Sequence, residues 1–212
     1  MRNYNAFPVT TDALLLSGFA AAYCEKRAVR RVIDLGCGSG ILALELAAKP
    51  GVSALAVDVS PDAVAAARAN AESAGLSSAV TAALCDVREI GAVAARASFD
   101  LAVCNPPYFG AAGGRAPEDA ARRSGAVESG AAFGDFCRAA SYALRRGGGF
   151  LAVVRTERLA EAFRELTDAK LEPKLLRLVQ SSAAAAPKLA LIAAASGAKP
   201  GVRTLPALIT GG

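Results

Sequence analysis

The sequence predicts an α/β fold with a mostly parallel sheet and helices on both of its faces. Short apolar segments typical of buried strands alternate along the chain with longer segments typical of helices. Several of the strand-like segments end in glycine or acidic residues, at the edge where open α/β sheets bind ligands. A length of 212 residues with 53% hydrophobic residues is sufficient for one packed domain, so residues 1–212 are expected to form a single domain.

The expected elements can be placed by residue range. Strands are expected at residues 31–35, 54–58, 79–84, 99–104, 150–154, 174–179 and 189–195. Helices are expected at residues 41–48, 61–73, 133–144 and 156–170. Ser60 and Pro61 form a helix start, and residues 147–149, all glycine, are expected to form a turn. The stretch 110–132 is longer than an ordinary connection, which favours a functional loop.

Composition excludes several kinds of chemistry. The chain has no histidine, which excludes Ser-His-Asp and Cys-His catalysis and histidine-bound metals. Five cysteines without a CxxC pair argue against a disulfide framework and a zinc site, so no metal is expected. A net charge of +5 suits an anionic partner, although a solubilising surface explains it equally well. The sequence shows no signal peptide and no membrane span, so a cytoplasmic protein without a membrane partner is expected.

A glycine-rich segment follows the first expected strand. Residues 34–40 read DLGCGSG and lead directly into a helix. Glycine at every second position allows a sharp turn and lets a ligand approach the backbone closely. The GxGxG spacing differs from the GxGxxG of dinucleotide enzymes, which disfavours an NAD-dependent oxidoreductase. A glycine loop alone is weak evidence, because tight strand–helix turns also use glycine.

Two acidic residues follow the next strands. Asp58 ends the second expected strand, where an acid can accept hydrogen bonds from both ribose hydroxyls of a nucleotide. Asp86 follows the third strand, where it could hold an adenine amino group. Each acid could instead be a helix N-cap. The cap alternative is stronger for Asp86 than for Asp58, because Ser60 already supplies the cap after the second strand.

The fourth expected strand ends in the tetrapeptide Asn105, Pro106, Pro107 and Tyr108, which we interpret as catalytic. The prolines make the turn rigid and fix the direction of the asparagine side chain. The Asn105 amide oxygen and the Pro106 carbonyl can each accept one N–H of an exocyclic amine, which localises the nitrogen lone pair for attack on an electrophile. Tyr108 can stack on the substrate ring and Phe109 can extend the apolar wall. Asn-Pro-Pro alone would also form an ordinary turn.

Together these segments resemble the class I S-adenosylmethionine methyltransferases. The resemblance implies a Rossmann-like, seven-stranded sheet whose last strand is antiparallel, and S-adenosylmethionine as cofactor. It also implies a set of residues lining the cofactor: Asp12, Asp34, Gly36, Cys37, Gly38, Gly40, Asp58, Val59, Asp86, Val87 and Asn105.

The flanking segments are similar to the family of tRNA adenine-N6 methyltransferases that act at position 37 of a valine tRNA. The similarity lies in FPVTTDALLL at residues 7–16, RTERL at 155–159, LEPKLLRLV at 171–179, and residues 197–209. It implies methylation of adenine N6 with the tRNA anticodon loop as partner, and places Asp12 over the cofactor, where a capped helix is the equal alternative. Arg122 and Arg123 would contact RNA, and Lys170, Lys174, Arg177, Lys199 and Arg203 could contact phosphates.

Other functions remain alternatives. The tetrapeptide also suits methylation of a glutamine amide, as in release-factor methyltransferases, but those enzymes usually carry a separate N-terminal helical domain. DNA adenine methyltransferases normally have a target-recognition domain, for which no segment is evident. A cofactor-binding module without catalysis would be favoured if Asn105 or Tyr108 were missing, and both are present. The oligomeric state cannot be predicted from the sequence.

Overall fold

The computed structural model of the chain describes residues 10–106 and 130–211. Across these residues one sheet has the strand order β3-β2-β1-β4-β5-β7-β6-β8, with β9 also paired to β6. The first four strands are β1 (Arg31–Leu35), β2 (Ser53–Asp58), β3 (Val80–Leu84) and β4 (Phe99–Cys104). The others are β5 (Leu144–Arg155), β6 (Leu171–Gln180), β7 (Leu189–Ser196), β8 (Arg203–Thr204) and β9 (Leu208–Ile209).

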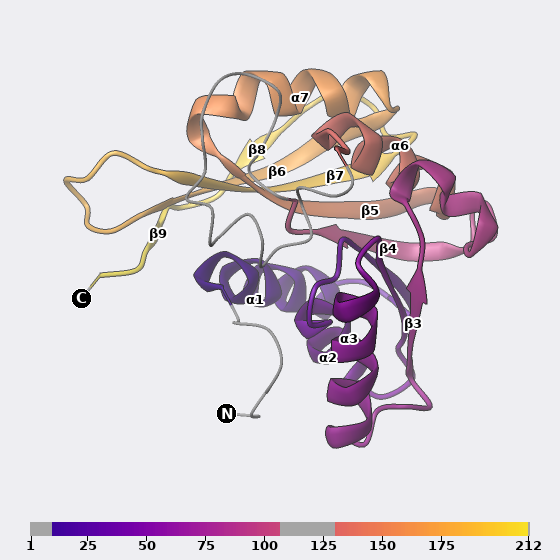
Figure 1. Cartoon of the computed structure of the whole chain (residues 1–212). Helices are drawn as coiled ribbons and strands as arrows, with labels where there is room; N and C mark the ends of the chain where they lie inside the picture. Colours follow the sequence, from indigo (N-terminus) through magenta and orange to yellow (C-terminus); the bar gives the residue numbers. More distant parts are fainter. Residues whose placement is uncertain (1–9, 107–129, 212) are drawn as a thin grey trace.

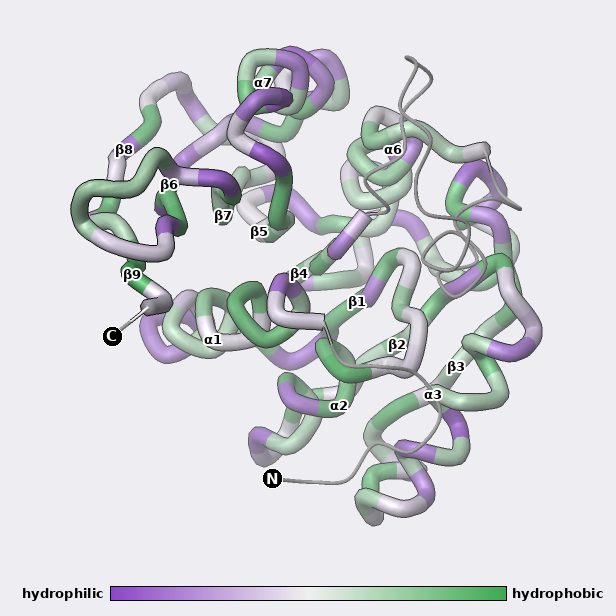
Figure 2. Tube along the Cα trace, turned by 60° about the vertical axis from the view of Figure 1, so that its left-hand side comes forward, coloured by the Kyte–Doolittle hydropathy of each residue, from purple (hydrophilic) through white to green (hydrophobic). Residues whose placement is uncertain are grey.

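Helices cover both faces of the sheet (Figure 1). One face carries α1 (Thr11–Glu25), α2 (Ile41–Ala47) and α3 (Pro61–Ser73), whose buried residues form one core cluster with the sheet. The other face carries the 3-10 helix η1 (Val87–Ala92), α6 (Phe133–Ala143), the 3-10 helix η2 (Thr156–Arg158) and α7 (Leu159–Asp168). In Figure 2 the turns of α7 alternate between hydrophilic and hydrophobic residues, as expected for a helix with one face on the sheet.

The strand directions define two edges of the sheet. Strands β1 to β5 pair in parallel, while β7 is antiparallel to both β5 and β6. The carboxyl ends of β1 to β5 therefore lie together with the start of β7 and the end of β6. We call this the carboxyl edge, and the opposite one the amino edge. The expected mostly parallel sheet with helices on both faces and an antiparallel strand near its end is confirmed.

Two expectations about strands were wrong. The sheet has nine strands in the described residues and not seven, because two-residue segments pair in parallel with the outer strand β6. These short strands supply hydrogen bonds to an edge that would otherwise be unpaired. In addition, the glycines at 147–149 are not a separate turn: they lie inside β5.

Crowding explains the glycines inside β5. A Cβ on Gly149 would lie 2.5 Å from the Tyr23 hydroxyl, and one on Gly148 would lie 2.8 Å from the Arg145 carbonyl. Both positions are buried. Glycine at position 149 allows α1 to pack closely against the sheet, and glycine at position 148 allows close packing against β4 and the start of β5. Gly147 alone has a turn-like backbone, with φ of 79°.

No helix in the described parts of the chain combines the length and apolar character that crossing a membrane requires.

Candidate active site

The glycine loop after β1 has left-handed backbone at Gly36 (φ 72°), Gly38 (φ 52°) and Gly40 (φ 78°). Only glycine adopts this conformation without strain. A Cβ on Gly36 would press on the Phe136 ring at 3.2 Å, and one on Gly40 would meet the Ala67 Cβ at 3.0 Å. A Cβ on Gly38 would meet nothing within 4 Å among the described residues. The outer glycines therefore pack the loop onto the protein, whereas Gly38 faces open space.

Gly40→Ala is expected to destabilise the protein by about 2–3 kcal/mol, because left-handed strain adds to crowding against Ala67. Gly51→Ala is the matched control, since Gly51 has nearly the same φ of 77° and no atom within 4 Å of its Cβ position. Strain alone should cost the control about 1 kcal/mol. Denaturant unfolding of both variants measures the difference, and equal losses would show that Ala67 does not crowd position 40.

Asp34 lies at the base of the glycine loop and is fully buried. Its Oδ2 accepts a hydrogen bond of 3.1 Å from the Ala43 backbone N–H in the first turn of α2, whose N-cap Gly40 has no side chain to serve this purpose. Its Oδ1 has no hydrogen-bond partner among the described residues. Burial raises the pKa of Asp34 to about 7, which the Ala43 N–H partly opposes and Asp58 increases. A buried carboxylate oxygen without a donor is well suited to a cationic or N–H-bearing ligand.

Asp58 holds the loop from the end of β2. Its Oδ2 accepts from the Gly38 N–H at 2.9 Å and its Oδ1 accepts from the Ser60 N–H at 3.0 Å. Burial raises the pKa of Asp58, while the N–H groups of Ser60 and Gly38 act in the opposite direction. The helix cap of α3 is supplied by Ser60, as expected from the sequence. Asp58 therefore fixes the glycine loop and remains at the carboxyl edge, where it was expected to meet a ribose.

Asn70 of α3 also supports the glycine loop, and it was not among the residues predicted from the sequence. It is buried in α3 and its Nδ2 donates to the Ser39 carbonyl at 3.0 Å. The available signal was a polar amide in an alanine-rich helix, where asparagine is unfavourable unless its side chain has a specific partner.

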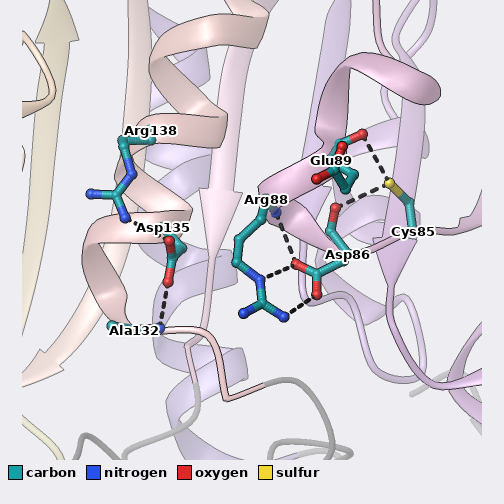
Figure 3. Close-up of polar contacts among 7 residues, drawn as sticks. All are labelled: Cys85, Asp86, Arg88, Glu89, Ala132, Asp135 and Arg138. Atoms are coloured by element: carbon teal, nitrogen blue, oxygen red, sulfur yellow. Dashed lines mark hydrogen bonds and ion pairs between the residues drawn. The ribbon is translucent and has the colours of Figure 1, made fainter.

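Asp86 and Arg88 form a local ion pair after β3 (Figure 3). The Asp86 carboxylate accepts from the Arg88 backbone N–H and from its guanidinium, and it caps η1. The hydrogen bonds from the Arg88 side chain lower the pKa of Asp86. The N-cap alternative is thus realised. A role in holding an adenine amino group is compatible with it, because each carboxylate oxygen has two lone pairs.

Asn105 follows β4, two residues beyond Val103, which pairs with Asp34 of β1. Asn105 therefore lies at the carboxyl edge, next to the strand that leads into the glycine loop. The Asn105 Nδ2 donates to the Thr10 Oγ1 at 3.4 Å, and the Asn105 Oδ1 is a buried atom without a partner among the described residues. This oxygen is an acceptor ready for a substrate N–H.

The other site residues expected from the sequence fall into two groups. Asp12 lies half-buried in the first turn of α1, next to Thr10, and Val59, Val87, Cys37 and Pro106 adjoin the strand ends. Pro107, Tyr108, Phe109, Arg122 and Arg123 lie outside the described residues. The structure thus brings together the glycine loop, the acids and Asn105, while the proposed ring-stacking and RNA contacts remain predictions.

Comparison with known proteins identifies the family. Residues 10–172 match the model of the methyltransferase small domain. The chain belongs to this family. Its cofactor is therefore S-adenosylmethionine, and the expected class I methyltransferase fold is confirmed. A structure described as a predicted O-methyltransferase from Agrobacterium tumefaciens covers 94% of the chain and 87% of its own length, with a TM-score of 0.74 and 21% identity.

Curated relatives carry two different substrate names. A tRNA1(Val) (adenine(37)-N6)-methyltransferase of Shewanella amazonensis is 34% identical over 102 residues, which are 48% of this chain and 42% of the relative. A release factor glutamine methyltransferase of Rhodospirillum rubrum is 42% identical over 80 residues, which are 37% of this chain and 23% of the relative. The chain thus spans less than half the length of these relatives.

The residues at the site fit S-adenosylmethionine. Asp34 Oδ1, which has no hydrogen-bond partner in the described part of the chain, can accept from the ammonium group of its methionine part, and Gly38 leaves room for close approach. Asp58 and Asp86 lie at consecutive strand ends, as ribose and adenine contacts require.

Proposed function

We propose that this protein transfers a methyl group from S-adenosylmethionine to N6 of an adenine in tRNA, at position 37 of a valine tRNA. The observation that carries the proposal is Asn105, which lies at the carboxyl edge next to β1 and whose buried amide oxygen has no hydrogen-bond partner among the described residues. Histidine is absent from the chain, which fits chemistry that rests on positioning and hydrogen bonding.

The Asn105 Oδ1 would accept one N–H of the exocyclic amine, and the Pro106 carbonyl would accept the other. These bonds pull the nitrogen away from planarity and localise a lone pair that conjugation otherwise spreads over the ring. The cofactor supplies an electrophilic methyl group on a sulfonium. The amine nitrogen forms the new N–C bond as the C–S bond breaks and sulfur keeps the bonding pair. The excess proton of the amine then passes to water.

A tRNA substrate is supported by the names of the relatives and by the excess of basic residues. The structure divides those residues between the two edges. Lys170, Lys174, Lys199 and Arg203 lie around the start of β6 and the end of β7, at the amino edge away from Asn105. Lys188 immediately precedes β7, whose first residue Leu189 pairs with Arg155 at the end of β5, so Lys188 lies at the carboxyl edge. Contacts with tRNA phosphates beside the target base should therefore come from Lys188 and its neighbours at the carboxyl edge.

Lys188→Glu is expected to raise the KM for tRNA by about 5- to 10-fold at low salt. The slope of log KM against log salt concentration should fall by about 1, which corresponds to one phosphate contact. Lys199→Glu is the matched control, because it makes the same charge change on an exposed residue at the opposite edge. Its KM should change less than about twofold. Steady-state kinetics over a salt series gives both values, and equal effects would contradict an RNA site confined to the carboxyl edge.

Transfer of labelled methyl groups to unmodified tRNA, followed by nucleoside analysis and mapping, tests the proposed function. N6-methyladenosine at position 37 of a valine tRNA is expected. Release factor is the parallel substrate, because relatives named as glutamine methyltransferases match residues of this chain at 41–42% identity. Label in the release factor and none in tRNA would replace the proposed substrate while keeping the amide-nitrogen chemistry.

A further inference from the structure

Helix α1 reaches the proposed catalytic residue through its N-cap. Thr10 caps the helix, and its Oγ1 accepts a hydrogen bond of 3.2 Å from the Ala13 backbone N–H. The same oxygen accepts from the Asn105 Nδ2 at 3.4 Å, although the two residues are 95 positions apart. A threonine hydroxyl has two lone pairs, so both bonds can exist together.

The orientation of the Asn105 amide decides whether its oxygen or its NH₂ group faces the substrate. The amide oxygen and nitrogen have nearly the same shape, so rotation by half a turn exchanges an acceptor for a donor. In the observed orientation Nδ2 points to Thr10, and the buried Oδ1, which has no partner within residues 10–106 and 130–211, is available to a ligand. In the opposite orientation an N–H group would face the N–H of the substrate amine and would repel it.

We propose that Thr10 is a positioning residue that holds the Asn105 amide with its oxygen toward the substrate. The proposal rests on the proposed function. Thr10 does this through its hydroxyl oxygen, and its use as the cap of α1 keeps that oxygen in place. The first turn of α1 is thereby part of the active site. Substitutions that disturb the N-cap of α1 will also change the orientation of the Asn105 amide.

Three substitutions separate this effect from helix capping. Thr10→Gly keeps a favourable N-cap residue but removes the acceptor, so the melting temperature should change little. Its kcat should fall roughly 3- to 10-fold, in line with the loss of one neutral hydrogen bond, while the Kd for S-adenosylmethionine stays within twofold. Thr10→Ser should keep the wild-type kcat. Thr10→Asp caps the helix with a group that can only accept, so it should retain or raise kcat.

The side-chain amide of Asn105 gives a readout that does not depend on turnover. Its NH₂ signals in a ¹⁵N-correlated NMR spectrum can be assigned by their loss in Asn105→Ala. They should shift in Thr10→Gly and keep a hydrogen-bonded position in Thr10→Asp. Unchanged signals and unchanged kcat in Thr10→Gly would overturn the inference, and so would a loss of kcat that only reflects weaker cofactor binding. If the wild type methylates no amine but the signals behave as expected, the proposed function fails and the positioning contact stands.

Discussion

Asn105→Ala is expected to lower kcat for methyl transfer by about 10²- to 10³-fold, the scale seen when one preorganised polar group is removed from an active site. The substitution deletes the buried Oδ1 that has no partner in the described residues, so the amine keeps its delocalised lone pair. Asp34 and Asp58 are untouched, and the Kd for S-adenosylmethionine should therefore change much less than kcat. Single-turnover kinetics and calorimetric cofactor binding provide the two values.

Asn105→Asp is the informative companion variant. A carboxylate has nearly the shape of the amide and can accept at either oxygen, so it should retain more activity than alanine. Rotation of the carboxylate by half a turn still presents an oxygen to the substrate. Thr10→Gly should therefore lower kcat less in the Asn105→Asp background than in the wild type. An Asn105→Ala enzyme that turns over at more than about a tenth of the wild-type rate would be too active for the residue to have the role assigned to it.

The glycine loop could be predicted from the sequence because its constraints are local. Alternating glycines after a strand and before a helix require left-handed backbone, and the structure has it at Gly36, Gly38 and Gly40. The position of Asn105 at a strand end was predictable for the same reason, since the two prolines after it end the strand.

Contacts between distant segments were not predictable in this way. Glycines at 147–149 are typical of a turn, but Tyr23 of a helix more than 100 residues earlier occupies the space that a side chain at Gly149 would need. The bond from Asn105 to Thr10 likewise depends on how α1 packs across the sheet. The Asp86–Arg88 pair is local, yet nothing in the sequence decides whether the carboxylate caps a helix, binds arginine or meets a ligand, and it does the first two.

Asp34→Asn is expected to stabilise the cofactor-free protein at pH 8 while weakening its binding of S-adenosylmethionine. Burial raises the pKa of Asp34 from its ordinary value of 3.8 to about 7. Between these values the folded state binds a proton that the unfolded state has released, so stability falls as pH rises through this window. The charged carboxylate then costs up to about 4 kcal/mol above pH 7. The asparagine removes this cost, but its buried amide N–H lacks a partner and costs about 1–3 kcal/mol. The free energy of unfolding should therefore rise by about 1–3 kcal/mol in the variant.

Cofactor affinity should fall in Asp34→Asn, although the stability of the cofactor-free protein rises. Loss of a charge-assisted hydrogen bond to the cofactor ammonium should raise its Kd by about 10- to 100-fold in Asp34→Asn. In the wild type, the affinity should rise as pH increases through about 7, because Asp34 must lose its proton to meet a cation. This rise should be absent in the variant. Calorimetric titrations from pH 5.5 to 8 measure it, and an identical pH dependence in both proteins would contradict the role of Asp34.

Asp100 provides a control, because its pKa is shifted in the opposite direction from that of Asp34. Its carboxylate accepts from the backbone N–H groups of Arg30 and Arg31 and from the Arg145 guanidinium at the amino edge. Although partial burial acts to raise it, these donors lower the pKa of Asp100 overall, so its stabilising effect is complete above the unfolded pKa and is lost as pH falls. Asp100→Asn should therefore destabilise the protein at pH 8 and leave cofactor affinity unchanged. Two buried or half-buried aspartates would then respond oppositely to the same substitution, because Asp34 leaves one oxygen for a ligand and Asp100 uses both within the fold.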